Sequence, residues 1–481
     1  SFKYVQGSSY DKNTYLNYFR INYTRKLQPY GAVTLFRSTL ISSKLNFTIA
    51  NTSQNILLFD VTNAENMKTV EGEQSNNSYQ FSAVNTSIKE YAMVDLSQEI
   101  SKPVFVENIQ NQNLHALEGK EMVIIVQPCL KKYAEQLAQL HLNDSGLESL
   151  IVYPNDIYNE FSSGTPDITA YRNFLKMLYD RANSQGKDAP RYLLLFGDGT
   201  YDNRLLSSHW TKPETSGFLL TYQSENSVSE VNSYVSDDYI GFLDDTEGAS
   251  LKDDKLDLGI GRLPVRTELE AMGVVNKIAR YLKNENPGNW QNNVTFLADD
   301  AIGSSSSNSM SERVHMVDSD SFAATLNVDY PDFRTTKIYM DSYERVVRNY
   351  SGARYPEAKK QFLNQLNEGT LILNYMGHGS QNDWTHEFIL RGEDINNLSL
   401  WITATCDFSR FDYDATSGGE LALLNPNGGA IALFSTVRVV FASSNKLITA
   451  SMFEHIFTEE NGKKLRLGDI IRYAKTRSSN S

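Results

Sequence analysis

Cysteine is almost absent from this chain. Cys129 and Cys406 are the only two among 481 residues, which excludes the framework of several disulfides that stabilises many small secreted domains. A disulfide between the two is not expected, because each follows a predicted strand in a different part of the chain. A lone cysteine is either a small buried apolar residue or a reactive thiol. We expect the first for Cys129 and the second for Cys406.

Positive charge, long apolar runs and clustered histidines are also scarce. The 45 Lys and Arg are outnumbered by 58 Asp and Glu, and the net charge of −13 disfavours nucleic acid and anionic membranes as main partners. No apolar run reaches about 18 residues, so no transmembrane segment is predicted. The 7 histidines form no HExxH or comparable cluster, which disfavours a metal hydrolase, and no required cofactor is expected. The first residues lack the charged and apolar regions of a signal peptide, which is either absent from the protein or already removed.

The chain is long enough for more than one domain, since single cores rarely exceed ~250–300 residues. Residues 1–119 contain short β-like segments separated by polar turn clusters, which predicts an N-terminal β-sandwich-like domain. From residue 120 onward, continuous apolar runs alternate with segments of helical spacing, the pattern of a doubly wound α/β domain with parallel sheets. A linker over 283–288 divides this part into 120–286 and 287–481.

Two apolar runs in the last part each end on a chemically useful residue. The run 371–376 leads into Gly377-His378-Gly379, and the run 398–405 ends directly on Cys406. Catalytic groups gather at the carboxyl ends of parallel strands, so a His and a Cys 28 residues apart in sequence can be neighbours in space. This pair is the constellation of a cysteine nucleophile with an imidazole base.

These blocks resemble the gingipain-type cysteine peptidases, which share the caspase-like fold. The stretches LLLFGD at 193–198, SDDY at 236–239 and LDLGIGR at 256–262 agree with the same family. The resemblance covers 122–481 and implies a caspase-like three-layer αβα domain made of two subdomains, with mostly parallel sheets. A β domain ahead of the peptidase is more similar to the surface sortases of the type IX secretion system than to secreted gingipains.

The resemblance implies roles for a few residues of this chain. His378 matches the general acid and base, Cys406 the nucleophile, and Gly379 a backbone donor to the oxyanion. An acid that orients the histidine is expected by analogy, with Asp198 and Asp237 as the candidates, and sequence alone does not choose between them.

Substrate and metal contacts are implied less directly. Trp384, Asp237 and Arg438 are candidate substrate-binding residues, although a packing role for Arg438 is the alternative. No residue can be assigned to the base of an S1 pocket, so the Arg or Lys preference of gingipains is not carried over. Structural calcium is usual in the family, and the acidic pairs that could bind it or form solvated loops are Asp237-Asp238, Asp244-Asp245, Asp253-Asp254 and Asp299-Asp300.

For the whole chain, the resemblance implies a cysteine endopeptidase that removes C-terminal sorting domains from exported proteins. Its partners would be those protein substrates and other outer-membrane secretion components, and its location extracellular or on the outer-membrane surface. Two alternatives stay open: a secreted gingipain-like general protease, and a non-catalytic surface scaffold that keeps the fold. Intact His378 and Cys406 favour an enzyme over a scaffold.

Overall fold

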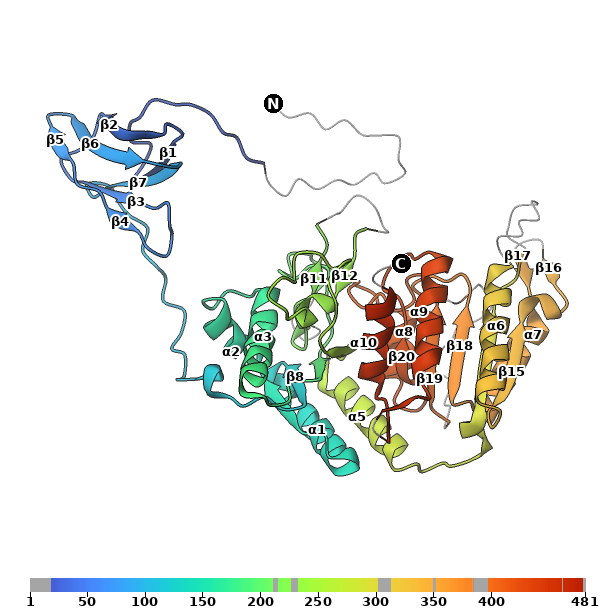
Figure 1. Cartoon of the computed structure of the whole chain (residues 1–481). Coiled ribbons are helices and arrows are strands. Elements are labelled where there is room, and N and C mark those ends of the chain that lie inside the picture. The colour runs from blue at the N-terminus through green and yellow to red at the C-terminus, as the bar shows by residue number, and fades with distance from the viewer. Residues whose placement is uncertain are drawn as a thin grey trace. The chain divides into compact units, whose positions relative to one another are not determined.

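The computed structural model describes residues 19–210, 215–225, 232–301, 313–348, 352–382, 384, 397–460 and 462–478. The chain divides into two compact units, Ser1–Gln110 and Asn111–Ser481 (Figure 1). The division comes before residue 119 because Leu114 is already tied to the second unit, where its N–H donates to the Glu160 carboxylate at 2.7 Å.

The first unit consists of two antiparallel sheets, with strand orders β1-β7-β3-β4 and β2-β6-β5. Both sheets contribute to one core, in which Phe47 and Phe81 stack with ring centroids 4.6 Å apart and Tyr91 and Met93 are buried. Two antiparallel sheets around one core confirm the predicted β-sandwich-like domain. The strands are β1 (Val33–Ser38), β2 (Ser42–Ala50), β3 (Ile56–Asp60), β4 (Lys68–Thr69), β5 (Glu73–Ser75), β6 (Ser78–Asn85) and β7 (Lys89–Asp95).

Subdomain A of the second unit is built on a parallel sheet of order β13-β10-β8-β9. Leu193 and Leu195 of β10 face the core under α2 and α3, whereas Tyr192 and Phe196 face the core under α1 and α5. This alternation explains why the strands are apolar on both faces. The elements are β8 (Met122–Val126), α1 (Lys131–Ser145), β9 (Ser149–Val152), α2 (Pro154–Phe161), α3 (Ile168–Gln185), β10 (Tyr192–Phe196), β13 (Gly259–Leu263) and α5 (Glu268–Leu282).

Subdomain B is built on a second parallel sheet, of order β15-β14-β18-β19-β20. Leu373 and Trp401 face a core shared with α7 and α8, while Ile372 and Ile402 face a core shared with α6, α9 and α10. The elements are β14 (Asn293–Ala298), α6 (Val314–Asp329), β15 (Arg334–Tyr339), α7 (Pro356–Glu368), β18 (Ile372–Met376), β19 (Ser399–Ala404), α8 (Gly418–Leu424), β20 (Ala430–Phe434), α9 (Ala442–His455) and α10 (Leu467–Ser478). Helices on both faces of each sheet confirm the predicted three-layer αβα architecture.

The last helix joins the two subdomains. α10 lies beside α9 (Figure 1) and also contacts β13 of subdomain A. Asp469 on α10 accepts hydrogen bonds from Tyr192 Oη at 2.8 Å and from the Arg191 guanidinium at 3.0 Å. A buried carboxylate of subdomain B is therefore paired with subdomain A.

Two helices begin with side-chain caps. Thr267 accepts the N–H of Glu270, and the Glu270 carboxylate accepts the N–H of Thr267, so α5 begins with a capping box. Asp167 accepts the N–H of Thr169 at 2.8 Å and caps α3. Among the described residues, no helix combines the length and the apolar character that a membrane crossing requires.

Candidate active site

His378 and Cys406 lie at the same level of neighbouring strands. β18 and β19 are parallel, and their register pairs Met376 with Ala404. His378 and Cys406 each follow that pair by two residues. The N–H of Gly377 donates to Ala404 O at 3.3 Å, so the pairing extends past the strands toward both residues. The sheet therefore brings them to one carboxyl edge.

The site also lies at a change in strand order. From β14 the chain passes to β15 on one side, and β18 then pairs with β14 on the other side. Open α/β sheets bind ligands in the crevice that forms at such a switch point. β14 ends at Ala298, so Asp299 lies at this switch point beside Gly377, and its N–H donates to Met376 O at 3.1 Å.

Asp299 is the acid that contacts His378. Its Oδ2 accepts the backbone N–H of His378 at 3.1 Å. Burial raises the pKa of Asp299 to about 6, while that hydrogen bond and the charge of His378 act in the opposite direction. A Cβ on Gly377 would lie 2.5 Å from both Asp299 Cβ and Tyr375 Oη, so only glycine fits between them. Tyr375 Oη donates to His378 O at 2.5 Å, and this bond fixes the backbone of the loop at His378.

A second imidazole packs against the first. The His315 ring on α6 meets the His378 ring edge to face, with centroids 5.3 Å apart and planes at 78°. His315 is buried. Sequence reasoning missed this residue because it lies inside a helix with no motif around it.

The loop after Cys406 is held by the segment that follows β20. Cys406 Sγ lies 3.8 Å from Val440 O, and the N–H of Asp407 donates to Arg438 O at 3.2 Å. Thr436 Oγ1 also donates to Thr405 O. Asp407 has a left-handed φ of 52°, which Asp tolerates better than most residues. Cys406 is half-buried, so its thiol remains accessible. The contacts described above fix the backbone on either side of it.

The structure corrects the expectation that Asp198 orients the histidine. Asp198 Oδ2 accepts from Arg266 Nε at 2.5 Å, and Oδ1 is buried without a hydrogen-bond partner. Asp237, the other candidate, binds both Arg262 Nε and its terminal nitrogen, at 2.9 and 2.7 Å. Asp299 could have been found by sequence, because it directly follows a buried strand.

Two residues expected to bind substrate are instead part of the packing. Trp384 is 0% exposed and stacks on Tyr375 with centroids 4.9 Å apart. Its backbone forms an isolated antiparallel bridge with Gly379. The buried Arg438 guanidinium binds both oxygens of Asp412 at 2.7 and 2.5 Å and also Ser233 O at 2.6 Å. These contacts correct the predictions for Trp384 and Arg438.

Two other predictions concern residues outside the candidate active site. Cys129 is exposed, and its Sγ donates to Ser216 O at 3.3 Å, so the expectation that it is buried is wrong.

Of the acidic pairs considered for calcium, Asp244 approaches two other carboxylates. Oxygens of Asp244, Glu247 and Asp257 lie within 4.8 Å of one another, and carboxylate oxygens are ligands that calcium prefers.

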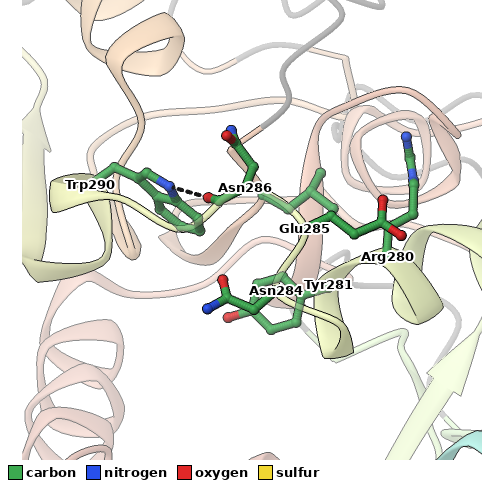
Figure 2. A pocket seen from close by; sticks show the side chains of 7 residues that line it. Arg280, Tyr281, Asn284, Glu285, Asn286 and Trp290 are labelled. Carbon is green, nitrogen blue, oxygen red and sulfur yellow. Dashed lines mark hydrogen bonds between the residues drawn. The ribbon is translucent and has the colours of Figure 1, made fainter.

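A pocket of about 310 Å³ lies away from the catalytic edge, where α5 passes into the connection between the subdomains (Figure 2). Trp290 Nε1 donates to Asn286 O at 2.9 Å within its wall. Leu398, which precedes β19, also lines it. The pocket therefore belongs to the amino-terminal end of β19, whereas Cys406 follows the carboxyl end. Its lining is Arg280, Tyr281, Asn284, Glu285, Asn286, Trp290 and Leu398.

Comparison with known proteins places these features in a family context. The model of peptidase family C25 matches residues 115–481, which is nearly all of the second unit. A search of curated proteins found no match.

Several solved structures are similar to this chain, among them the following three. Dimeric latent PorU from Porphyromonas gingivalis matches with 36% identity and a TM-score of 0.49 over 55% of this chain and 26% of that chain, so this chain spans about a quarter of it. The Arg-specific cysteine proteinase gingipain R (RgpB) matches with 17% identity and a TM-score of 0.50, over 76% of this chain and 73% of that one. The complex of Porphyromonas gingivalis RgpB pro- and mature domains matches with 17% identity and a TM-score of 0.51, over 75% and 74%. The two RgpB structures show that the fold is shared.

Proposed function

The chain belongs to peptidase family C25, and from this membership we propose that it is a cysteine endopeptidase with Cys406 as nucleophile and His378 as general acid and base. The observation that carries the proposal is the register of β18 and β19. It sets His378 and Cys406 side by side at the carboxyl edge of the sheet, at a switch point of strand order.

The reaction would proceed through a thioester. The Cys406 sulfur gives its proton to His378 and attacks the carbonyl carbon of the scissile peptide. The N–H groups of Gly379 and Cys406 stabilise the oxyanion, typically by about 3 kcal/mol each. The C–N bond then breaks, and the leaving amine takes the proton from His378. Water or another amine attacks the thioester, His378 accepts the proton of that nucleophile, and Cys406 is released.

Asp299 supports the histidine in this scheme. Its buried carboxylate lies next to the position where His378 becomes positively charged, and a nearby negative charge favours that form. A positioned general base typically contributes about 10²- to 10⁴-fold to the rate. Asp299 therefore takes the orienting role for which Asp198 and Asp237 were the sequence candidates.

The finer proposal is a type IX secretion sortase that removes C-terminal sorting domains from exported proteins at the outer-membrane surface. It is supported by the order of the units, since an antiparallel β unit precedes the region that matches the family model. Secretion components of the outer membrane would be its partners. A general gingipain-like protease is the alternative with the same site.

A thiol-reactive peptide probe tests the catalytic proposal. The protein should label at Cys406 faster than a free thiol at pH 7, and His378→Ala should slow labelling to the rate of an ordinary thiol. Cys129→Ala is the matched control, because the exposed Cys129 lies outside the site and its loss should leave the fast phase unchanged. Equal labelling rates for the protein and His378→Ala would refute the proposal.

The sortase role needs a different substrate. A purified exported protein that carries its C-terminal sorting domain should be cut once, ahead of that domain, and an added primary amine should appear on the new C-terminus by mass spectrometry. Cys406→Ala should leave the substrate intact. Indiscriminate cutting of an unrelated unfolded protein at a similar rate would favour the general protease.

A further inference from the structure

The first turn of α8 contacts both catalytic loops. The N–H of Gly418 donates to Gln381 O at 2.7 Å, and the N–H of Gly419 donates to Phe408 O at 2.8 Å. Gln381 follows His378 by three residues, and Phe408 follows Cys406 by two. One short turn therefore sets the spacing between the loop of the histidine and the loop of the cysteine.

The first turn of α8 packs so closely against the two loops that it cannot shift without moving them. A Cβ on Gly418 would collide with the Phe408 ring, and a Cβ on Gly419 would collide with Ser409 Oγ. Phe408 is itself buried in the core of subdomain B. Backbone in direct contact with two loops transmits its own displacement to both of them.

The same turn is held by a buried carboxylate. Glu420 Oε2 accepts from the N–H of Ser417 at 2.8 Å and from Ser417 Oγ at 2.7 Å, which forms the capping box of α8. Its other oxygen, Oε1, lies 3.4 Å from a terminal nitrogen of Arg266. Arg266 precedes α5, so this contact connects α8 to subdomain A.

Arg266 is shared between two carboxylates. Its Nε donates to Asp198 Oδ2 at 2.5 Å, and Asp198 is the second residue after β10. Asp198 is 0% exposed and Glu420 is 2% exposed. The other charged groups that face this cluster are Arg262, whose guanidinium donates to Asp198 O at 3.1 Å and is neutralised by Asp237, and Glu270, which acts on Arg266.

Two buried carboxylates and one shared guanidinium leave an excess negative charge. Burial raises the pKa of Asp198 to about 7 and that of Glu420 to about 8, and the charge of Asp198 adds to the rise at Glu420. Asp198 Oδ1 is buried without a hydrogen-bond partner. Burial therefore favours the protonated form of this pair.

We propose that Asp198, Arg266 and Glu420 are positioning residues for the catalytic pair. Asp198 and Arg266 of subdomain A hold Glu420, and Glu420 fixes the first turn of α8. Through that turn the cluster fixes the loops that carry His378 and Cys406. The inference rests on the proposed function of those two residues, and it assigns the control of their relative position to a cluster outside the site.

The test compares a single and a double variant in kinetics. Asp198→Asn replaces one carboxyl group with a neutral one of the same shape and leaves Arg266 paired with Glu420. It should keep kcat within threefold at pH 7. We expect kcat of the protein to fall above about pH 8 as the cluster loses its proton, and Asp198→Asn should remove this fall. The double variant Asp198→Asn/Glu420→Gln leaves Arg266 without a carboxylate, and kcat should fall at least tenfold while KM stays within twofold.

Asp469→Asn is the matched control, because it breaks another buried pair between the subdomains, on α10 instead of α8. It should lower Tm and keep kcat within twofold. A double variant that loses no more kcat than Asp469→Asn at equal loss of Tm would overturn the proposal, as would an unchanged alkaline limb in Asp198→Asn. The alkylation rate of Cys406 in a Cys129→Ala background reports positioning separately. If the protein cleaves no peptide but the double variant still slows alkylation, the proposed function fails and the positioning role stands.

Discussion

The Asp299 carboxylate accepts the backbone N–H of His378 at 3.1 Å. The two residues lie 79 positions apart in the chain, on strand ends that pair directly in the sheet. A buried acid therefore lies one strand away from the histidine, on the side opposite Cys406. This relation gives the site an order of acid, imidazole and thiol across β14, β18 and β19.

Asp299→Asn should lower activity in a pH-dependent way. The amide oxygen can still accept the N–H of His378, so the change removes mainly the negative charge. At pH 8, kcat/KM should fall about tenfold, as expected for the loss of about 1.4 kcal/mol. Because the pKa of Asp299 is about 6, the protein and the variant should converge at pH 5, where Asp299 is protonated.

A pH–rate profile from 5 to 9 checks this prediction. Asp300→Asn is the matched control, since the Asp300 carboxylate accepts from Tyr355 Oη at 2.6 Å and should have the smaller effect. A constant ratio of kcat/KM between protein and Asp299→Asn at every pH would contradict the assigned role.

Gly377→Ala should damage both the fold and the activity. The added Cβ would lie 2.5 Å from Asp299 Cβ and from Tyr375 Oη, so one of them must move. Overpacking of this kind typically destabilises by about 1–3 kcal/mol. Gly261→Ala is the control, because a Cβ there meets nothing within 4 Å. The two variants should therefore differ in Tm and in peptidase activity. Equal Tm values would contradict the prediction, because they would show that the residues around Gly377 can move to accommodate the added Cβ.

Asp257→Asn should stabilise the protein at alkaline pH. Burial and the nearby Glu247 and Asp244 raise the pKa of Asp257 to about 6, above the value of about 3.9 in an unfolded chain. The folded state thus holds a proton between these values, and the stability that the neutral form provides is lost as pH rises through 6. Tm of Asp257→Asn should exceed that of the protein at pH 8 and match it at pH 4. The exposed Asp188→Asn should show no such difference.

Lys277→Met should destabilise the contact between the subdomains. Lys277 on α5 is fully buried, and its Nζ donates to the carbonyl oxygens of Leu423, Asn425, Gly428 and Ala430 at 2.5–3.3 Å. Methionine fills the space but leaves these acceptors unpaired, which costs about 3 kcal/mol or more. Denaturant unfolding should show the loss, whereas Lys283→Met, at an exposed position, should change stability by less than about 0.5 kcal/mol.

Local patterns were sufficient to predict the buried strands and to select His378 and Cys406 as the candidate catalytic pair. The apolar runs before His378 and Cys406 are continuous, and parallel strands place their carboxyl ends together. Asp299 was within reach of the same reasoning, since it follows β14. It was not selected because the pairing of β14 with β18 depends on the crossover to β15, which no local pattern encodes.

The roles of Trp384, Arg438 and Asp198 depended on contacts with distant segments. A tryptophan near a catalytic loop and an arginine after a neighbouring strand suggest substrate contacts by sequence position alone. In the structure Trp384 fills the core of subdomain B, and Arg438 neutralises Asp412. Side chains of this size and charge are placed by whichever partner lies across the fold, and sequence distance does not reveal that partner.

The sequence by itself determined the division into β and α/β parts, the parallel sheets, and the choice of His378 and Cys406 as the candidate catalytic pair. These follow from periodicity and from residue types at strand ends, which are local properties. Only the tertiary structure decided that Asp299 contacts His378, that His315 packs against it, and that Asp198 shares Arg266 with Glu420. Those relations depend on strand order and on the packing of two subdomains, which bring together residues that share no local pattern.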